Sequence, residues 1–244
     1  MKQSRFSGLL FYSMVFLLAS CGGNESEKKA STDSTAVDTS AAVVTPKITT
    51  ITTPQNMMVV THKVSNYAKW KTSYDEHDSI RLANGIHSYV IGRGLKDSNM
   101  VLVAVKVDDT TKAKAFTKDP GLKKAMQKGG VMGMPTFTLT TMTFEDTATI
   151  SSDLRSRTTF TVKDWGAWQK AFEDAKQERL DNGIAVRAYG HNSDNDKKVV
   201  LVTAIMDTAK AFAYYKSDML KKRRAESGVI GEPERFLYRV VQRY

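Results

Sequence analysis

Cysteine is almost absent from this chain, because Cys21 is the only one among 244 residues. No disulfide can therefore form within the chain, and a cluster of thiolate ligands around a metal is excluded. The sequence has four histidines on different predicted elements, without HxH or HxxxH spacing, so we predict no metal site. They are His62, His77, His87 and His191.

Complete catalytic signatures are also missing. The sequence contains no glycine-rich phosphate loop after a strand, no GxSxG elbow and no paired-carboxylate pattern. We therefore predict no cofactor, and no motif identifies a substrate.

The sequence also has no dense stripe of residues with one sign of charge, although its formal net charge is +10. The basic residues are spread along the chain, and two short basic stretches occur at 122–128 (LKKAMQK) and 220–226 (LKKRRAE). Nucleic-acid binders usually combine a basic stripe with interleaved aromatics or a known module. We therefore expect no nucleic-acid partner and interpret both stretches as solvated helix faces.

The N-terminal segment has the pattern of a secretion signal. Lys2 and Arg5 precede an apolar run at 8–18, which is too short to span a bilayer. The run ends in Leu-Ala-Ser-Cys at 18–21, which resembles the lipobox of bacterial lipoproteins. An ordinary secretory signal or a short anchor helix is the alternative.

The resemblance implies that residues 1–21 are a lipoprotein signal peptide and lipobox, and that Cys21 is acylated and binds membrane lipid. We expect a lipoprotein of the bacterial cell envelope, outside the cytoplasm, with the outer membrane as the favoured location. Residues 22–56 are rich in Ser, Thr and Ala without apolar periodicity and are predicted to form a flexible linker.

The rest of the chain contains one module twice. The stretch 67–86 (YAKWKTSYDEHDSIRLANGI) recurs 98 residues later at 165–184 (WGAWQKAFEDAKQERLDNGI). The same offset aligns residues 64–144 with the second copy without a gap, which indicates duplication of a whole domain. We place the first repeat at 57–147 and the second at 155–244. Pairs of identical residues include Trp70/Trp168, Arg81/Arg179, Gly85/Gly183, Asp109/Asp207, Gly130/Gly228 and Pro135/Pro233.

Each repeat has the predicted order βαββαβ. A β-branched opening strand is followed by an N-cap, Asn66 or Asp164, and by aromatic residues at i, i+3 and i+7, which form the buried face of a helix. Two strands, a second helix broken near 119–120 and 217–218, and a last strand complete the module. This order is α+β and ferredoxin-like, with helices on one sheet face. The opposite face must be covered, so we expect the two repeats to form an intrachain pseudo-dimer.

The element order, the duplication, the aromatic helix and a GV-x-G-x-P turn at 130–135 and 228–233 resemble the dimeric α/β-barrel superfamily. That group includes antibiotic-biosynthesis-monooxygenase-like proteins and haem-degrading monooxygenases. The resemblance covers 57–244 and implies a pseudo-dimeric α/β barrel. The Asn, Trp and His of the haem-degrading members cannot be matched here, so no catalytic residue is carried over.

Strand alternation predicts which residues face the space between the two sheets. Small or apolar residues at 86, 88, 90 and 92, and at 184, 186, 188 and 190, are assigned to the helix side. The opposite face then supplies polar and aromatic side chains for a ligand. The candidate ligand-binding residues are His87, Tyr89, Arg93, Arg187, Tyr189 and His191. Alternatively, these side chains fill the core or reach solvent at the barrel mouth.

Three functional hypotheses remain open. The first is a membrane-anchored protein that binds a small, flat or anionic molecule between the sheets. The second is a cofactor-independent monooxygenase-like enzyme, with a tyrosine or histidine for proton transfer and Arg93 or Arg187 for an oxyanion. The third is an interaction module with a filled interior. His62 aligns with Phe160, which indicates that the copies have diverged around a site.

Overall fold

The computed structural model describes residues 49–244, and each repeat within this range has the predicted βαββαβ order. The lipobox, the signal segment and the linker up to residue 48 lie outside the described residues. The first repeat comprises β2 (Gln55–Val64), α1 (Tyr67–Glu76), α2 (Asp78–Ala83), β3 (Ile86–Gly94), β4 (Met100–Val107), α3 (Thr110–Phe116), α4 (Pro120–Lys128) and β5 (Val131–Asp146). The second comprises β6 (Leu154–Val162), α5 (Trp165–Asp174), α6 (Lys176–Asp181), β7 (Ile184–Asn192), β8 (Asn195–Ile205), α7 (Thr208–Tyr215), α8 (Asp218–Glu226) and β9 (Val229–Arg243).

The helices begin where the sequence predicts. The side chains of Asn66 and Asp164 accept hydrogen bonds from the backbone N–H groups of Lys69 and Ala167, which satisfies donors that a helix start leaves unpaired. Gly85, which follows α2, has a φ of 66°, a conformation that glycine adopts without a steric penalty. The predicted breaks between α3 and α4 and between α7 and α8 are confirmed.

The first helix of each repeat is also broken, which the sequence does not predict. The break falls at His77 in the first repeat and at Ala175 in the second. Arg81 then folds back and donates to the carbonyl of Tyr74 at 2.6 Å, and Arg179 makes the same contact with Phe172. Each arginine thereby satisfies a carbonyl that the end of α1 or α5 leaves unpaired.

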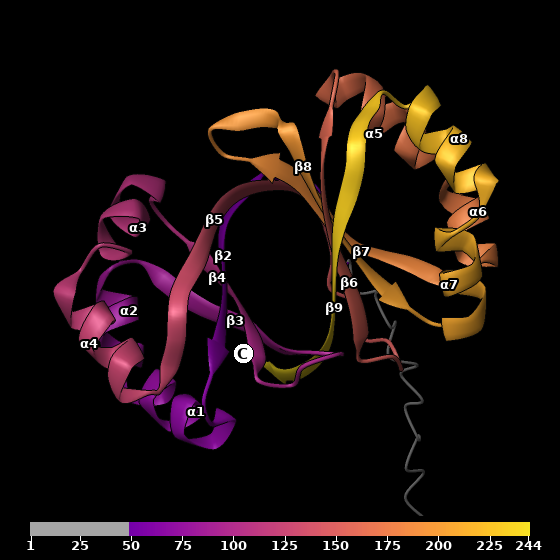
Figure 1. The fold of residues 1–244 in the computed structure, drawn as a ribbon. Helices are drawn as coiled ribbons and strands as arrows, with labels where there is room; N and C mark the ends of the chain where they lie inside the picture. Colours follow the sequence, from indigo (N-terminus) through magenta and orange to yellow (C-terminus); the bar gives the residue numbers. More distant parts are fainter. Residues whose placement is uncertain (1–48) are drawn as a thin grey trace, which may run out of the picture. The chain divides into compact units, whose positions relative to one another are not determined.

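The strands form one closed barrel with the helices outside it (Figure 1). The order β5-β2-β4-β3-β9-β6-β8-β7 is completed by pairing of β7 with β5, so the two repeats join edge to edge at β3–β9 and at β5–β7. The predicted intrachain pseudo-dimeric α/β barrel is therefore confirmed. The last part of the predicted linker is ordered, because β1 (Thr50–Ile51) pairs with the end of β5.

A glycine stands at each joint between the repeats. A Cβ on Gly92 would lie 2.2 Å from the ring of Tyr238, and a Cβ on Gly190 would lie 2.1 Å from the carbonyl oxygen of Thr141. Gly190 meets backbone, which cannot move aside as a side chain can. The closure of the barrel at β5–β7 therefore depends on the absence of a side chain at this position.

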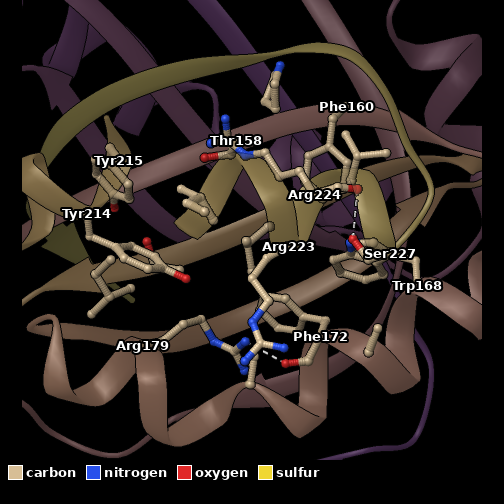
Figure 2. A pocket seen from close by; sticks show the side chains of 18 of the residues that line it. Thr158, Phe160, Trp168, Phe172, Arg179, Tyr214, Tyr215, Arg223, Arg224 and Ser227 are labelled. Atoms are coloured by element: carbon tan, nitrogen blue, oxygen red, sulfur yellow. Dashed lines mark hydrogen bonds between the residues drawn. The ribbon is translucent and has the colours of Figure 1, made fainter. Parts of the chain in front are cut away.

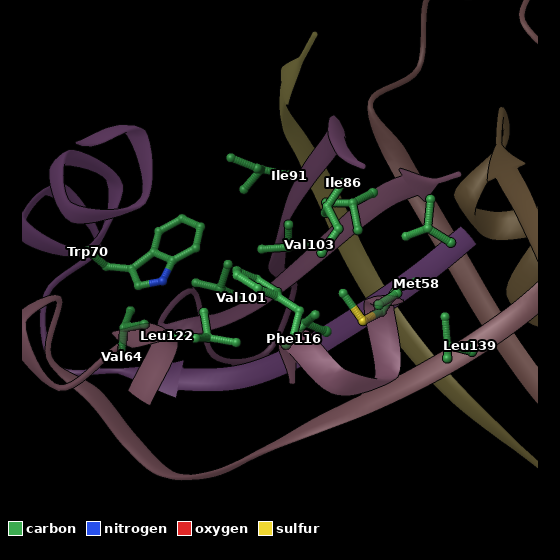
Figure 3. Close-up of a cluster of buried hydrophobic side chains, with 14 residues drawn as sticks. Met58, Val64, Trp70, Ile86, Ile91, Val101, Val103, Phe116, Leu122 and Leu139 are labelled. Carbon is green, nitrogen blue, oxygen red and sulfur yellow. The ribbon is translucent and has the colours of Figure 1, made fainter. Parts of the chain in front are cut away.

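The two repeats differ in how well their cores are filled. In the first, one continuous cluster links Trp70, Ile91, Val101, Phe116 and further apolar residues between sheet and helices (Figure 3). In the second, the corresponding core is divided into two clusters, one around Tyr214 and one around Trp168. Among residues 49–244, no helix is long and apolar enough to cross a bilayer.

His62 occupies a core position of the first repeat. Its ring lies 5.5 Å from that of Trp70, and both ring nitrogens are buried without a hydrogen-bond partner among the described residues. Burial lowers the pKa of His62 to about 4, because an imidazolium would lose its hydration there. The folded protein therefore carries a neutral histidine at neutral and mildly acidic pH.

We expect Gly190→Ala to destabilise the fold by about 1 to 3 kcal/mol, because the new methyl group overlaps backbone at the β5–β7 joint. Chemical denaturation followed by circular dichroism measures this change. Gly166→Ala is the matched control, because a Cβ there meets only Asp164 Oδ1, at 3.6 Å. Equal stability of the two variants would contradict the assigned role of Gly190.

His62 also predicts a pH dependence of stability. The unfolded chain takes up a proton at His62 near pH 6.5, whereas the folded chain does so only near pH 4. The free energy of unfolding should fall by about 3 kcal/mol as the pH drops through this window. Urea denaturation between pH 7 and pH 4 should show this loss in the wild type and a flatter profile in His62→Phe, which carries the residue found at 160. If the unfolding free energies of the wild type and His62→Phe fall in parallel with pH, His62 is not the cause of the loss.

Candidate functional site

A cavity of about 170 Å³ lies between the sheet and the helices of the second repeat, where the core is divided (Figure 2). Strands β6, β8 and β9 form one wall, and helices α5 to α8 form the other. The volume is close to that of a cavity, about 150 Å³, that holds a benzene ring. The corresponding space in the first repeat measures only about 70 Å³.

Aromatic and aliphatic side chains line much of this cavity. Trp168 and Phe172 on α5 are stacked, with ring centroids 4.9 Å apart, and Phe160 on β6 lies against Trp168. Leu201, on β8, continues the apolar wall. Such surfaces suit the faces of a flat molecule, because aromatic rings prefer offset-stacked or edge contacts.

Arginines replace apolar residues on the other side of the cavity. We call the residue 98 positions earlier the counterpart. The counterparts of Arg224 on α8 and Arg235 on β9 are Met126 and Phe137, which pack against the core of the first repeat. Duplicated domains begin with the same core, so these two positions have diverged, and they are apolar in the first copy and cationic in the second.

Neither guanidinium forms an ion pair with a carboxylate among the described residues, although the charge of Glu232 opposes the lowering of the Arg224 pKa. The Arg235 guanidinium lies 3.7 Å from the centre of the Tyr215 ring, and its Nε is buried without a partner. Burial lowers the pKa of Arg224 and of Arg235, and for Arg235 the neighbouring charge of Arg224 lowers it further. The two cations are therefore partly desolvated, and neither has an ion-paired carboxylate among the described residues.

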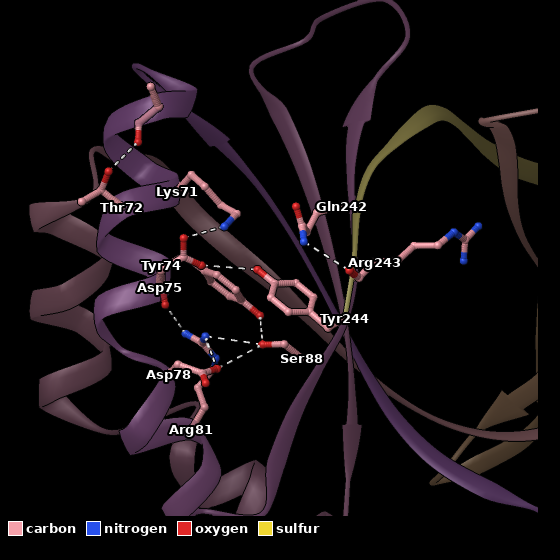
Figure 4. A network of polar contacts seen from close by, with 11 residues as sticks. Lys71, Thr72, Tyr74, Asp75, Asp78, Arg81, Ser88, Gln242, Arg243 and Tyr244 are labelled. Atoms are coloured by element: carbon pink, nitrogen blue, oxygen red, sulfur yellow. Dashed lines mark hydrogen bonds and ion pairs between the residues drawn. The ribbon is translucent and has the colours of Figure 1, made fainter.

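Arg179 adds a third cation to the helix side. Its first-repeat counterpart, Arg81, pairs with Asp78 at 2.8 Å within a network that includes Tyr74 and Ser88 (Figure 4). The Asp78 position is Lys176 in the second repeat, so this ion pair is lost. Burial lowers the pKa of Arg179 to about 10.

Two carboxylates lie at one end of the cavity: Glu226 lines it and pairs with Lys222 at 3.9 Å, and Glu178 lies next to the lining residues Tyr214 and Arg223. Glu178 accepts hydrogen bonds from the Tyr214 hydroxyl at 2.7 Å and from Arg223 Nε at 2.9 Å. Burial raises the pKa of Tyr214, and Glu178 raises it further. Because Glu178 and Glu226 have other partners, Arg224 and Arg235 are the cations open to an anionic ligand.

The six candidates predicted from the sequence do not come together. Tyr89 and Arg187 line a different cavity, inside the barrel. His87 lies at an exposed end of β3 and pairs with Asp108 at 3.0 Å. The prediction that Arg93, Tyr189 and His191 face the space between the sheets is wrong.

Those three side chains point to the helices instead. Arg93 lies over the ring of Tyr67 at 4.2 Å, His191 contacts Trp165 with ring centroids 4.9 Å apart, and the Tyr189 hydroxyl donates to Glu173. The cause is a β-bulge between Ser88 and Val90 and another between Val186 and Ala188. An extra residue in a strand reverses the side-chain alternation beyond it.

Sequence reasoning missed the arginines of the helix-side cavity. The overlay of the two repeats contains the signal, because Met126/Arg224 and Phe137/Arg235 are exchanges of an apolar for a charged residue. The interpretation of 220–226 as a solvated face does not hold for Arg224, which is half-buried and lines the cavity.

Restoring the first-repeat residues at this cavity should stabilise the protein. We expect Arg224→Met/Arg235→Phe to raise the free energy of unfolding by about 1 to 3 kcal/mol, because buried charges are replaced by apolar groups. Urea denaturation measures the change, and Arg239→Thr, which removes an exposed ion pair with Asp153 outside this cavity, serves as control. A loss of stability in the double variant would show that the arginines serve the fold.

Comparison with known proteins identifies the fold. No family model matches the sequence, and no curated protein matches it. A solved chlorite dismutase-type protein superposes with a TM-score of 0.54 at 13% identity, covering 78% of this chain and 96% of its own. An anthrone oxidase-like protein gives 0.52 at 15% identity, covering 77% and 92%.

A proposed monooxygenase from Fusobacterium nucleatum subsp. nucleatum ATCC 25586 also gives a TM-score of 0.52, at 12% identity, covering 78% of this chain and 93% of its own. At these identities the similarity concerns the fold alone. The chain thus has the fold of the dimeric α/β barrels, with both ferredoxin-like halves in one polypeptide.

Proposed function

We propose that this protein is a membrane-anchored binding protein, and that the helix-side cavity of its second repeat takes a small, flat molecule with an anionic group. The replacement of core residues by Arg224 and Arg235 around a ring-sized cavity carries this proposal. Half-buried cations without an ion-paired carboxylate reduce stability, so their presence in one copy and not in the other favours a functional over a structural origin.

The two kinds of lining residue suit two different parts of the proposed ligand. Trp168 and Phe172 offer stacked aromatic surface to its apolar ring. Arg224 and Arg235 offer guanidinium donors to a carboxylate or a similar group, which guanidinium can bind through two parallel hydrogen bonds. The low polarity of the surroundings strengthens the attraction between the charges.

The anchor is the second part of the proposal. Acylation of Cys21 would attach the chain to a membrane of the bacterial envelope, with the outer membrane favoured. The lipobox-like sequence at 18–21 supports it. Residues 22–48 would then connect the lipid to β1, and the ligand would be met outside the cytoplasm.

Binding is favoured over the enzymatic alternative by the positions of the predicted proton-transfer groups. His87 is exposed at the end of β3, Tyr89 lies in the barrel interior and His191 lies against Trp165 on the helix side. These side chains do not converge on one ligand. A filled interaction module is disfavoured by the cavity itself.

Titration calorimetry with benzoate and 1-naphthoate tests the proposal, with the neutral amides of both acids as matched ligands. We expect the wild type to bind a carboxylate and Arg224→Met/Arg235→Phe to bind it at least about tenfold more weakly. Arg239→Thr, which removes a surface ion pair with Asp153, should bind like the wild type. No carboxylate binding, or full binding by the double variant, would overturn the proposal.

Native mass spectrometry of the purified protein should detect a co-purified ligand, and incubation of that ligand with the protein separates binding from catalysis. An unchanged ligand mass supports a binding protein. A change in the ligand mass that requires Arg224 and Arg235 would show that the protein is an enzyme that acts in the same cavity.

A further inference from the structure

We propose that the barrel interior contains a second, independent site, which binds a small oxyanion such as phosphate or sulfate through Arg155 and Arg157. The site lies in a cavity of about 80 Å³ between the two repeats, on the face of the sheet opposite to the helix-side cavity. It shares no residue with the ring-sized cavity described above.

The two arginines are placed side by side by strand geometry. Arg155 and Arg157 are two residues apart on β6, so both side chains point to the same face of the sheet, into the barrel. Arg155 is 3% exposed, and the Nε of Arg157 is buried without a hydrogen-bond partner. Tyr238 is the cross-strand neighbour of Arg155 on β9 and also lines the cavity.

No carboxylate of the described residues forms an ion pair with Arg155 or Arg157, although the charges of Asp153 and Glu234 act on them. Arg155 Nη1 donates to the carbonyls of Ser152 at 2.8 Å and Leu154 at 3.0 Å, which orient the guanidinium but carry no charge. Burial, together with the charges of Arg243 and Arg187, lowers the pKa of Arg155 to about 10, although Tyr238 and Asp153 act in the opposite direction. Two like charges on the inner face of the barrel therefore lack a directly paired counter-ion.

The two carboxylates that line the same cavity already have partners. Asp146 accepts from Arg187 Nη1 at 2.9 Å, and Glu145 accepts from Lys106 Nζ at 3.2 Å. Arg243, at the exposed edge of the cavity, adds a further cation. The positive charge around Arg155 and Arg157 consequently exceeds what the protein itself compensates.

Comparison of the repeats shows that the fold does not require these cations. The counterparts of Arg155 and Arg157 are Met57 and Val59, which line the opposite part of the same cavity. The counterpart of Arg187 is Tyr89, and that of Arg243 is Glu145. All four arginines thus come from the second repeat, whereas both carboxylates come from the first.

The dimensions select the ligand class. The volume is about half that of the ring-sized cavity, which leaves room for a compact anion but not for an aromatic acid. Guanidinium groups match the oxygens of phosphate and sulfate in charge and geometry. The phenol of Tyr238 adds a further donor, because burial raises its pKa and keeps it protonated.

Thermal denaturation and titration calorimetry of the purified full-length chain test the inference with phosphate, sulfate and glycerol phosphate, each against sodium chloride of equal ionic strength. We expect phosphate or sulfate to raise the Tm of the wild type above the chloride value. A free anion should act more strongly than glycerol phosphate. A stronger effect of the ester would overturn the assignment to a free oxyanion.

Arg155→Met/Arg157→Val restores the first-repeat residues and should abolish the oxyanion-specific rise in Tm. In oxyanion-free buffer this variant should melt at or above the wild-type temperature. Arg157→Lys keeps the positive charge but loses the planar guanidinium group. This variant should fold normally and bind the oxyanion at least about tenfold more weakly. It therefore remains informative if the double variant does not fold.

Two controls separate this site from the helix-side cavity. Arg224→Met/Arg235→Phe and Arg239→Thr should both keep the oxyanion response of the wild type. No oxyanion-specific Tm rise and no binding heat in the wild type, or an undiminished response in Arg157→Lys, would overturn the inference without affecting the proposed aromatic carboxylate site.

Discussion

The pairing of strand edges between the two repeats is the constraint on which the rest of the structure depends. A single repeat would leave two exposed strand edges and one uncovered sheet face, which are unfavourable in water. The joints β3–β9 and β5–β7 remove the edges and enclose the uncovered face in one step. Gly92 and Gly190 allow the close approach that this closure needs. The closed interior is also what deprives Arg155 and Arg157 of water.

Duplication separates the requirements of folding from those of function. Residues that build the fold are the same in both copies, as for Trp70 and Trp168 or Asp109 and Asp207. The cavity-lining arginines without an ion-paired carboxylate, Arg224 and Arg235 on one face of the sheet and Arg155 and Arg157 on the other, all lie in the second copy. The first repeat keeps a continuous apolar core and shows what each of those positions needs for packing alone. It acts as an internal reference for the second.

The prediction of site residues failed at a specific place. Up to Ser88 the alternation of side chains agrees with the structure, and Tyr74 bonds to Ser88 on the helix side as expected. The bulge at Tyr89 then places Ile91 and Arg93 under the helices. The bulge at Arg187 does the same for Tyr189 and His191 in the other repeat. A bulge is created by pairing with a neighbouring strand, so it has no signature within the strand itself.

The sequence by itself determined the duplication, the order of elements, the helix caps and the pseudo-dimeric barrel, because these follow from local patterns and from a repeat that the chain contains in full. The tertiary structure alone decided the strand register, the sides that the arginines face and the size of the two cavities. These depend on contacts between residues far apart in the chain, such as Arg155 with Tyr238 or Arg187 with Asp146. A change of one residue in register turns a side chain from one face of the sheet to the other, and no local pattern records that choice.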